Sequence, residues 1–176
     1  QRLVYERSGP EGLLLYIYTD RCVYDAAWDE VTIAARGLIL DPFARRIVAT
    51  PFPKFFNFGE GTQALPDLPF ETTEKLDGSL IIIFYHAGRW RTATKGAFDS
   101  WQAEWAASHL AGTDLTALHP GITYLAEVIH PENRIVIRYD RAELVMLSAF
   151  RPDGAELTYD DIVQDASAIG WRAAQR

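Results

Sequence analysis

The sequence predicts an α+β domain in which antiparallel β-sheet dominates and helices are few. Short apolar, β-branched and aromatic runs alternate with clusters of Gly, Pro, Asn and Asp, a pattern typical of strands joined by turns. Only two segments have the spacing of helices. The 48% apolar content, with five Trp, eight Tyr and nine Phe, indicates an ordered core. A length of 176 residues suits one domain, or one domain and a fragment.

The N-terminal third is expected to hold three strands. The first apolar run is at 13–18, and a polar turn follows it. The second run, at 34–40, ends at Asp41-Pro42, and the run at 45–50 returns after it, which is the pattern of a β-hairpin. A looped region bracketed by several prolines then begins at Pro51.

The rest of the chain is expected to hold five strands and two helices. The strands are expected at 80–85, 89–94, 123–129, 134–139 and 143–149. A helix at 100–110, capped by Asp99 or Ser100, would bury Trp101 and Trp105 in the core. A second helix is expected to begin near Thr158 and to end near residue 169.

Composition and charge exclude several classes of protein. The net charge of −7 excludes a polycationic nucleic-acid coat, so any nucleic-acid contact must come from a local basic patch. A single cysteine, Cys22, excludes an intrachain disulfide and a Cys-based zinc cluster, which favours an intracellular, cytoplasmic location. No metal-site spacing links the four histidines, and no metal-ligating residue is predicted. Neither a bilayer-spanning run nor a leader is recognised, so no membrane partner is expected.

The segment Glu74-Lys75-Leu76-Asp77-Gly78-Ser79 carries the strongest chemical signal. It places a lysine at the mouth of an apolar strand, where loss of water would favour the uncharged, nucleophilic amine. The same tetrapeptide, Lys-x-Asp-Gly, also arises as the start of an ordinary hairpin with a solvated lysine. The motif alone therefore leaves both interpretations open.

The motif is one of six matched segments that follow one another along the chain. The six are 35–39, 53–60, 74–79, 94–96, 125–128 with 133–136, and 144–149. Together they resemble the covalent nucleotidyltransferase superfamily of ligases and capping enzymes. They look most like phage-type ATP-dependent RNA ligases of the RNA ligase 1 group. The resemblance implies an ATP-grasp-like ligase fold, with residues 1–176 as the N-terminal portion of a nucleotidyltransferase domain.

In that family the motif lysine attacks the α-phosphorus of ATP and forms a lysine–AMP intermediate. The AMP then passes to an RNA 5′-phosphate, and a 3′-hydroxyl displaces it to seal the strand. The resemblance thus implies that Lys75 is the nucleophile, and that the cofactors are ATP with Mg²⁺ or Mn²⁺. The implied partners are RNA ends, with nicked tRNA as one candidate, and the oligomeric state stays open.

The resemblance also implies a set of nucleotide-binding residues. They are Arg36, Lys54, Glu74, Leu76, Asp77, Gly78, Lys95, Glu127 and Met146. Glu127 would accept the ribose hydroxyl protons, and the alternative is a solvated or salt-bridged strand glutamate. Arg36 would contact nucleotide or phosphate, or pair with an acid at a sheet edge. Lys54 and Lys95 would hold phosphate oxygens, and the alternative is two ordinary exposed lysines.

Three further expectations concern the shape of the site. Asp77 and Gly78 would shape the turn that aims the lysine, with Gly78 allowing close backbone approach to the nucleotide. The strand at 144–149 would supply an apolar wall, with Met146 or Leu147 near the adenine. Phe56 is expected to pack beneath the nucleotide pocket.

Two elements of the family pattern do not occur before Arg176. They are a Glu-Gly strand whose acid binds metal and a Lys-x-Lys strand that grips the α-phosphate. We therefore interpret the chain as a piece of a longer enzyme, and the alternative is a shortened relative that works differently. We expect the chain alone to form little lysine–AMP, because the charge that develops on the phosphate is less stabilised. An open sheet edge would also favour self-association.

Three other functions remain as alternatives. One is a DNA ligase or a capping guanylyltransferase. Another is a non-catalytic nucleotide- or RNA-binding module that kept the pocket and lost the chemistry. The third is an unrelated β domain with a coincidental hairpin lysine.

Overall fold

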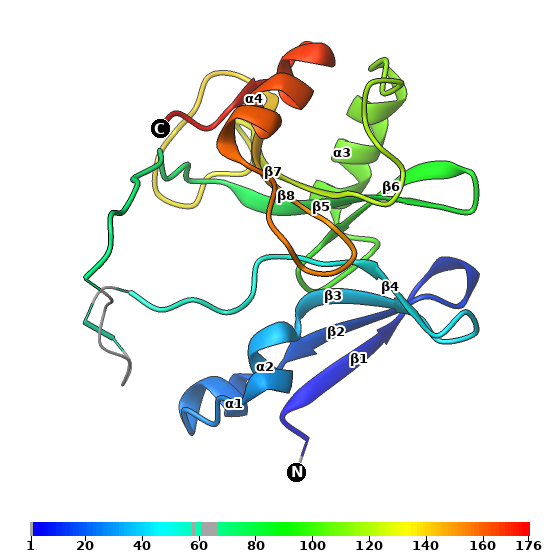
Figure 1. Cartoon of the computed structure of the whole chain (residues 1–176), viewed down its shortest axis with the longest axis vertical. Coiled ribbons are helices and arrows are strands. Elements are labelled where there is room, and N and C mark those ends of the chain that lie inside the picture. Colours follow the sequence, from blue (N-terminus) through cyan, green and yellow to red (C-terminus); the bar gives the residue numbers. More distant parts are fainter. Residues whose placement is uncertain (1, 58, 61–66) are drawn as a thin grey trace.

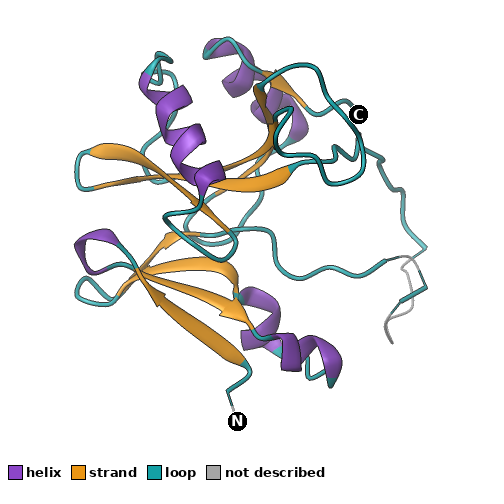
Figure 2. Cartoon of the chain, turned by 180° about the vertical axis from the view of Figure 1, so that it is seen from behind, coloured by secondary structure: helices purple, strands orange, loops and turns teal. Residues whose placement is uncertain are grey.

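Two β-sheets are stacked, and two helices cover the outer face of the larger sheet (Figure 1, Figure 2). The computed structural model describes residues 2–57, 59–60 and 67–176. The smaller sheet is antiparallel with the order β1-β2-β3-β4, formed by β1 (Val4–Ser8), β2 (Leu14–Tyr18), β3 (Arg36–Asp41) and β4 (Arg46–Ala49).

The larger sheet has the order β6-β5-β7-β8-β9 and is antiparallel except for the β8–β9 pair. Its strands are β5 (Ser79–His86), β6 (Arg89–Thr94), β7 (Thr123–Ile129), β8 (Glu143–Phe150) and β9 (Arg172–Ala173). The helices are α1 (Asp20–Tyr24), α2 (Glu30–Ala34), α3 (Trp101–Ala111) and α4 (Tyr159–Ala168), and a 3₁₀ turn spans Pro10–Gly12. The predicted α+β class is confirmed.

Strand β5 lies in the larger sheet, with the helices α3 and α4 on one face and the smaller sheet on the other. Because both of its faces are covered, its sequence is apolar without interruption. Ile81 and Ile83 face the core beneath α3 and α4, while Ile82 and Phe84 face the smaller sheet. All four are fully buried. Burying each side chain contributes about 1.5–3 kcal/mol, so this strand is a main source of cohesion between the layers.

The two predicted long helices are confirmed, and each begins at a hydroxyl cap. The Ser100 side chain accepts a hydrogen bond from the N–H of Ala103, and the Thr158 side chain accepts one from the N–H of Asp161. These bonds satisfy backbone donors that the first helical turn leaves free. The expectation that Trp101 is a core residue is wrong, because its side chain is 40% exposed. Small residues form the buried face of α3 instead, and Trp105 packs beside them.

The predicted strand positions are confirmed to within two residues, with one exception. No strand forms at 134–139, because the N–H groups of Val136 and Ile137 donate to the carboxylate of Asp77 and not to a neighbouring strand. The sequence analysis also missed β1, β9 and the short helices α1 and α2. Helix α2 has a capping box between Asp29 and Thr32, a local signal that could have revealed it.

No helix in the described part of the chain is both long enough and apolar enough to cross a membrane.

Candidate functional site

A cavity of about 930 Å³ opens at the end of the sheets where β5 begins. Its walls come from β3, the segment after β4, the turn before β5, the loop after β6, and strands β7 and β8. Of the predicted site residues, seven line it: Arg36, Glu74, Lys75, Leu76, Gly78, Lys95 and Glu127. The size is within the range of small-molecule sites.

Lys75 lies at the mouth of this cavity, one turn before β5. The chain has only three lysines, and two of them, Lys75 and Lys95, line the cavity. Lys75 is exposed. The expectation that burial at the strand mouth removes water from its amine is therefore wrong for this structure.

Glu127 projects from β7 into the cavity, and its carboxylate accepts a hydrogen bond from the N–H of Gly78 at 2.9 Å. Burial raises the pKa of Glu127 to about 7, although the Gly78 N–H and the nearby charge of Lys75 lower it. A carboxylate that changes charge near neutral pH is a common feature of functional sites. It can accept hydrogen bonds from ligand hydroxyls when it is ionised.

Gly78 can occupy its position because it lacks a side chain. A Cβ atom there would lie 2.2 Å from the backbone oxygen of Val128 and 3.0 Å from Cγ of Glu127. The backbone after Lys75 is thereby brought against β7. Close approach of this backbone to a nucleotide stays a prediction.

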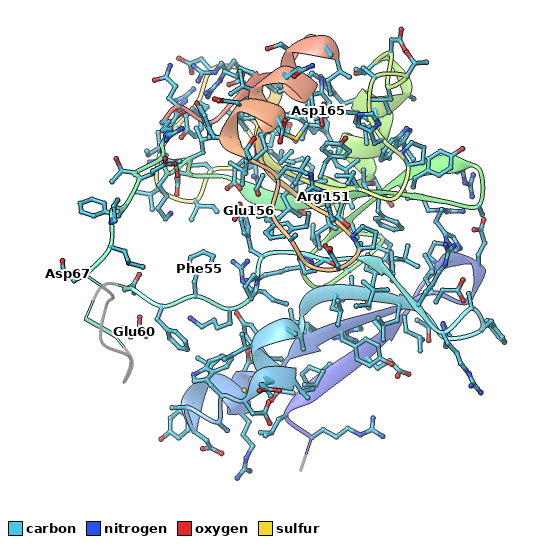
Figure 3. The ribbon with its side chains drawn as sticks, in the orientation of Figure 1. Phe55, Glu60, Asp67, Arg151, Glu156 and Asp165 are labelled. Carbon is cyan, nitrogen blue, oxygen red and sulfur yellow. The ribbon has the colours of Figure 1, made fainter. Side chains whose placement is uncertain are left out.

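Arg36, at the start of β3, offers a free hydrogen-bond donor. Its Nη1 is buried and has no hydrogen-bond partner within the described residues. The guanidinium lies 4.9 Å from the ring centre of Phe55, which also lines the cavity. Figure 3 shows the Phe55 ring pointing from the segment after β4 toward the side of the larger sheet. Because buried donors are almost always satisfied, Arg36 is suited to bind an acceptor on a ligand.

Glu74 lines the cavity, but its carboxylate is already engaged. It accepts hydrogen bonds from Nη1 of Arg172 at 2.9 Å and from the N–H of Gln175 at 3.3 Å. The Arg172 guanidinium, chiefly through this hydrogen bond, holds the pKa of Glu74 below its ordinary value. The arrangement attaches the segment before Lys75 to the C-terminal residues.

Three predicted nucleotide contacts do not line the cavity. Lys54 donates from Nζ to the backbone oxygen of Phe55 at 2.6 Å, and its ammonium lies 4.2 Å from the ring centre of Phe56. Phe56 is also outside the lining residues and packs edge-on against Trp28. Asp77 turns away to the loop at 134–139.

Met146 is, with Lys54 and Asp77, the third predicted nucleotide contact that does not line the cavity, and its assignment to the pocket wall is wrong. Its side chain is fully buried in the core beneath α4, because successive residues of β8 face opposite sides of the sheet. Leu147 faces the other side and lines the cavity. Of the two residues considered for the adenine, the structure therefore favours Leu147.

The sequence analysis missed several residues of the site. Phe55, Gln102 and Ile135 line the cavity, and Arg172 holds Glu74 from 98 positions away. Phe55 and Ile135 lie in the segments 53–60 and 133–136 that carry the resemblance, but no role was assigned to them. No local signal marks Gln102 or Arg172, because only the tertiary fold brings them beside the motif.

The described residues hold no group of three or more His, Cys, Asp or Glu side chains arranged to hold a metal ion. Mg²⁺ is commonly bound through only one or two carboxylates together with substrate phosphates and water, so this finding concerns protein-built sites alone.

Comparison with known proteins identifies the family of this chain. A family model for RNA ligases of the T4 RNA ligase 1 type matches residues 34–173. A protein from Thermovibrio ammonificans, named as a candidate RNA ligase, is 35% identical over 121 residues, covering 63% of this chain and 32% of that protein. The RNA ligase of Rhodothermus phage RM378 is 24% identical over 180 residues, covering 77% of this chain and 40% of that one.

A solved structure named as a candidate ATP-dependent DNA ligase, from Aquifex aeolicus, shares the fold. The TM-score is 0.65 at 17% identity, over 98% of this chain and 46% of that one. The chain thus spans less than half the length of these relatives. Because the family model covers most of its residues, the chain belongs to the RNA ligase family of the T4 RNA ligase 1 type.

Proposed function

We propose that this chain is the nucleotide-binding part of an ATP-dependent RNA ligase, with Lys75 as the nucleophile. Its amine attacks the α-phosphorus of ATP, a nitrogen–phosphorus bond forms, and pyrophosphate leaves. The AMP then passes to an RNA 5′-phosphate, and an RNA 3′-hydroxyl displaces it. RNA ends, including those of nicked tRNA, are the proposed substrates, and Mg²⁺ or Mn²⁺ is the proposed metal.

One observation carries this proposal: a single cavity is lined by a lysine, a carboxylate and an arginine whose buried nitrogen has no hydrogen-bond partner among the described residues. Lys75 supplies a nucleophile, Glu127 an acceptor for ribose hydroxyls, and Arg36 a free donor. Lys95 adds a second cation on the lining, suited to phosphate oxygens. Lys54, which lies outside this lining, can reach a nucleotide only if its side chain leaves Phe55 and Phe56.

A non-catalytic binding module is the second candidate, and the exposure of Lys75 favours it. Only an uncharged amine has the lone pair needed for attack, and an exposed side chain lacks the burial that favours this form. Such a module would bind ATP reversibly and form no covalent product.

The decisive experiment is labelling with α-³²P-ATP and Mg²⁺, followed by denaturing electrophoresis. It is run on the 176-residue chain and on the longest protein that its gene encodes. Label that survives denaturation in the longer protein, and is lost in Lys75→Ala, would support the ligase chemistry. Arg46→Ala, which removes an exposed cation from β4 outside the cavity, is the matched control and should keep the label.

Peptide mapping of the labelled longer protein then identifies which lysine carries the AMP. We expect the 176-residue chain alone to form little adenylate. Absence of label in the longer protein, with reversible ATP binding retained, would favour the binding module.

A further inference from the structure

The loop between β7 and β8, residues 130–142, both donates hydrogen bonds to the turn after Lys75 and accepts one from it. The carboxylate of Asp77 accepts hydrogen bonds from the N–H groups of Val136 at 2.7 Å and Ile137 at 2.6 Å. The N–H of Asp77 donates to the hydroxyl of Tyr139 at 3.2 Å. The turn and the loop are therefore connected through one side chain from each.

Apolar packing strengthens the same contact. The ring of Tyr139 packs against a cluster that contains Leu76, Ile129 and Val145. Leu76 is 7% exposed, so it is held in the interior although its neighbour Lys75 is exposed. Both residues that follow Lys75 are thus fixed, Leu76 by packing and Asp77 by hydrogen bonds.

Asn133 anchors the first half of the loop to the sheet. Its side-chain amide donates to the backbone oxygen of Val128 at 3.0 Å, and its amide oxygen accepts from the hydroxyl of Ser79 at 3.1 Å. The side chain is buried. The loop therefore has a firm base on β5 and β7, from which it can hold the turn.

Neither Asp77 nor Tyr139 lines the cavity. Asp77 therefore occupies a place in the motif without facing the space where a nucleotide would lie. Within the described residues the Lys75 amine makes no hydrogen bond or ion pair and its side chain is exposed, so the contacts by which the fold restrains this residue act on the backbone beside it.

We propose that loop 130–142 is a clamp that positions the backbone of Lys75, with Asp77 and Tyr139 as positioning residues and not as nucleotide ligands. This inference rests on the proposed function, since the position of the amine matters to the rate only if the amine reacts. A displacement of about 1 Å at a reacting group can lower a rate by about 100-fold. The N–H groups of Ile137 and Val136 hold the pKa of Asp77 below its ordinary value, so the carboxylate stays ionised and able to accept both bonds near neutral pH.

The first test compares Tyr139→Phe and Asp77→Ala with the parent, in the longest protein that the gene encodes. The rate of lysine–AMP formation is measured across ATP concentrations, which separates the maximal rate from the apparent ATP affinity. We expect the maximal rate to fall about 10- to 100-fold, with the apparent affinity within about twofold. Tyr85→Phe removes the same hydroxyl from near the far end of β5 and should leave both unchanged.

Equal losses of rate and affinity would show that these side chains bind the nucleotide, which overturns the clamp. An unchanged rate in both variants overturns it as well. The two variants should also be non-additive, because they loosen one shared contact.

A second measurement separates failure of the clamp from failure of the proposed function. The ¹³C signal of the methylene beside the Lys75 amine is recorded without ATP, and its absence from Lys75→Arg assigns it. The clamp predicts that this signal moves in Tyr139→Phe and stays in place in Tyr85→Phe. If the parent forms no lysine–AMP, the proposed function fails and this signal alone decides the clamp, which an unchanged signal in Tyr139→Phe would overturn.

Discussion

The raised pKa of Glu127 makes the stability of the fold depend on pH in a way that one substitution can remove. In Glu127→Gln the side chain keeps an oxygen that can accept the hydrogen bond from Gly78, but it can no longer ionise. The substitution therefore changes the charge and leaves the shape and the backbone contact in place. The substitution therefore isolates the free energy that folding loses by placing an ionised carboxylate in this cavity.

The sign follows from proton binding. In the unfolded chain Glu127 titrates near its ordinary pKa of 4.5, whereas in the folded chain burial raises the pKa to about 7. Between these values the folded state binds more protons than the unfolded state, so stability falls as the pH rises from 4.5 to 7. The full difference corresponds to about 3 kcal/mol, and water in the open cavity will reduce it.

The assay is urea unfolding of parent and Glu127→Gln at pH 4.5, 5.5, 6.5 and 8. We expect the free energy of unfolding of the variant, relative to the parent, to increase by about 1–3 kcal/mol across this series. The other titrating groups are the same in both proteins and cancel in the difference. A difference that stays within about 0.5 kcal/mol from pH 4.5 to 8 would refute the reasoning, because it would mean that Glu127 is as well solvated folded as unfolded.

Three further changes test other contacts by urea unfolding. Gly78→Ala should cost about 3 kcal/mol, because the new Cβ would meet the Val128 oxygen at 2.2 Å and displace the bond to β7. Arg172→Met should cost about 1 kcal/mol, because it removes the half-exposed ion pair with Glu74. Thr158→Ala should cost about 1 kcal/mol by removing the cap of α4.

Each of these changes has a matched control. Gly112→Ala should be nearly neutral, since its Cβ would meet only the His109 oxygen, at an ordinary 3.7 Å. Arg138→Met removes an ion pair whose side chains are 77% and 94% exposed. Ser108→Ala removes an exposed hydroxyl from α3 at a position that does not cap the helix. Effects of Gly78→Ala, Arg172→Met or Thr158→Ala no larger than those of their controls would contradict the corresponding contact.

Much of the fold was predictable because local patterns identify strands and helices. The run at 80–85 predicts a buried strand, and Ser100 and Thr158 predict the starts of two helices. The segment at 134–139 misled the same reasoning. Its apolar residues are those of a strand, but its amides are used by a carboxylate 59 positions earlier in the sequence.

The candidate site divides in the same way. The motif around Lys75 was predictable, because its residues are adjacent in the sequence and directly precede an apolar strand. Lys54 was predicted to join it and instead lies against Phe56. The conformation of a flexible four-carbon side chain depends on neighbours that sequence does not reveal.

The sequence by itself determined the class of fold, the order of most strands along the chain and which residues are candidates for the proposed chemistry. The tertiary structure decided which of those residues share a cavity. Alternation along β8 predicts that Met146 and Leu147 face opposite ways, but not which of them faces the cavity. That choice depends on how the two sheets and the helices stack. The same stacking brings Arg172 to Glu74 and Tyr139 to Asp77, contacts that local sequence patterns cannot reveal.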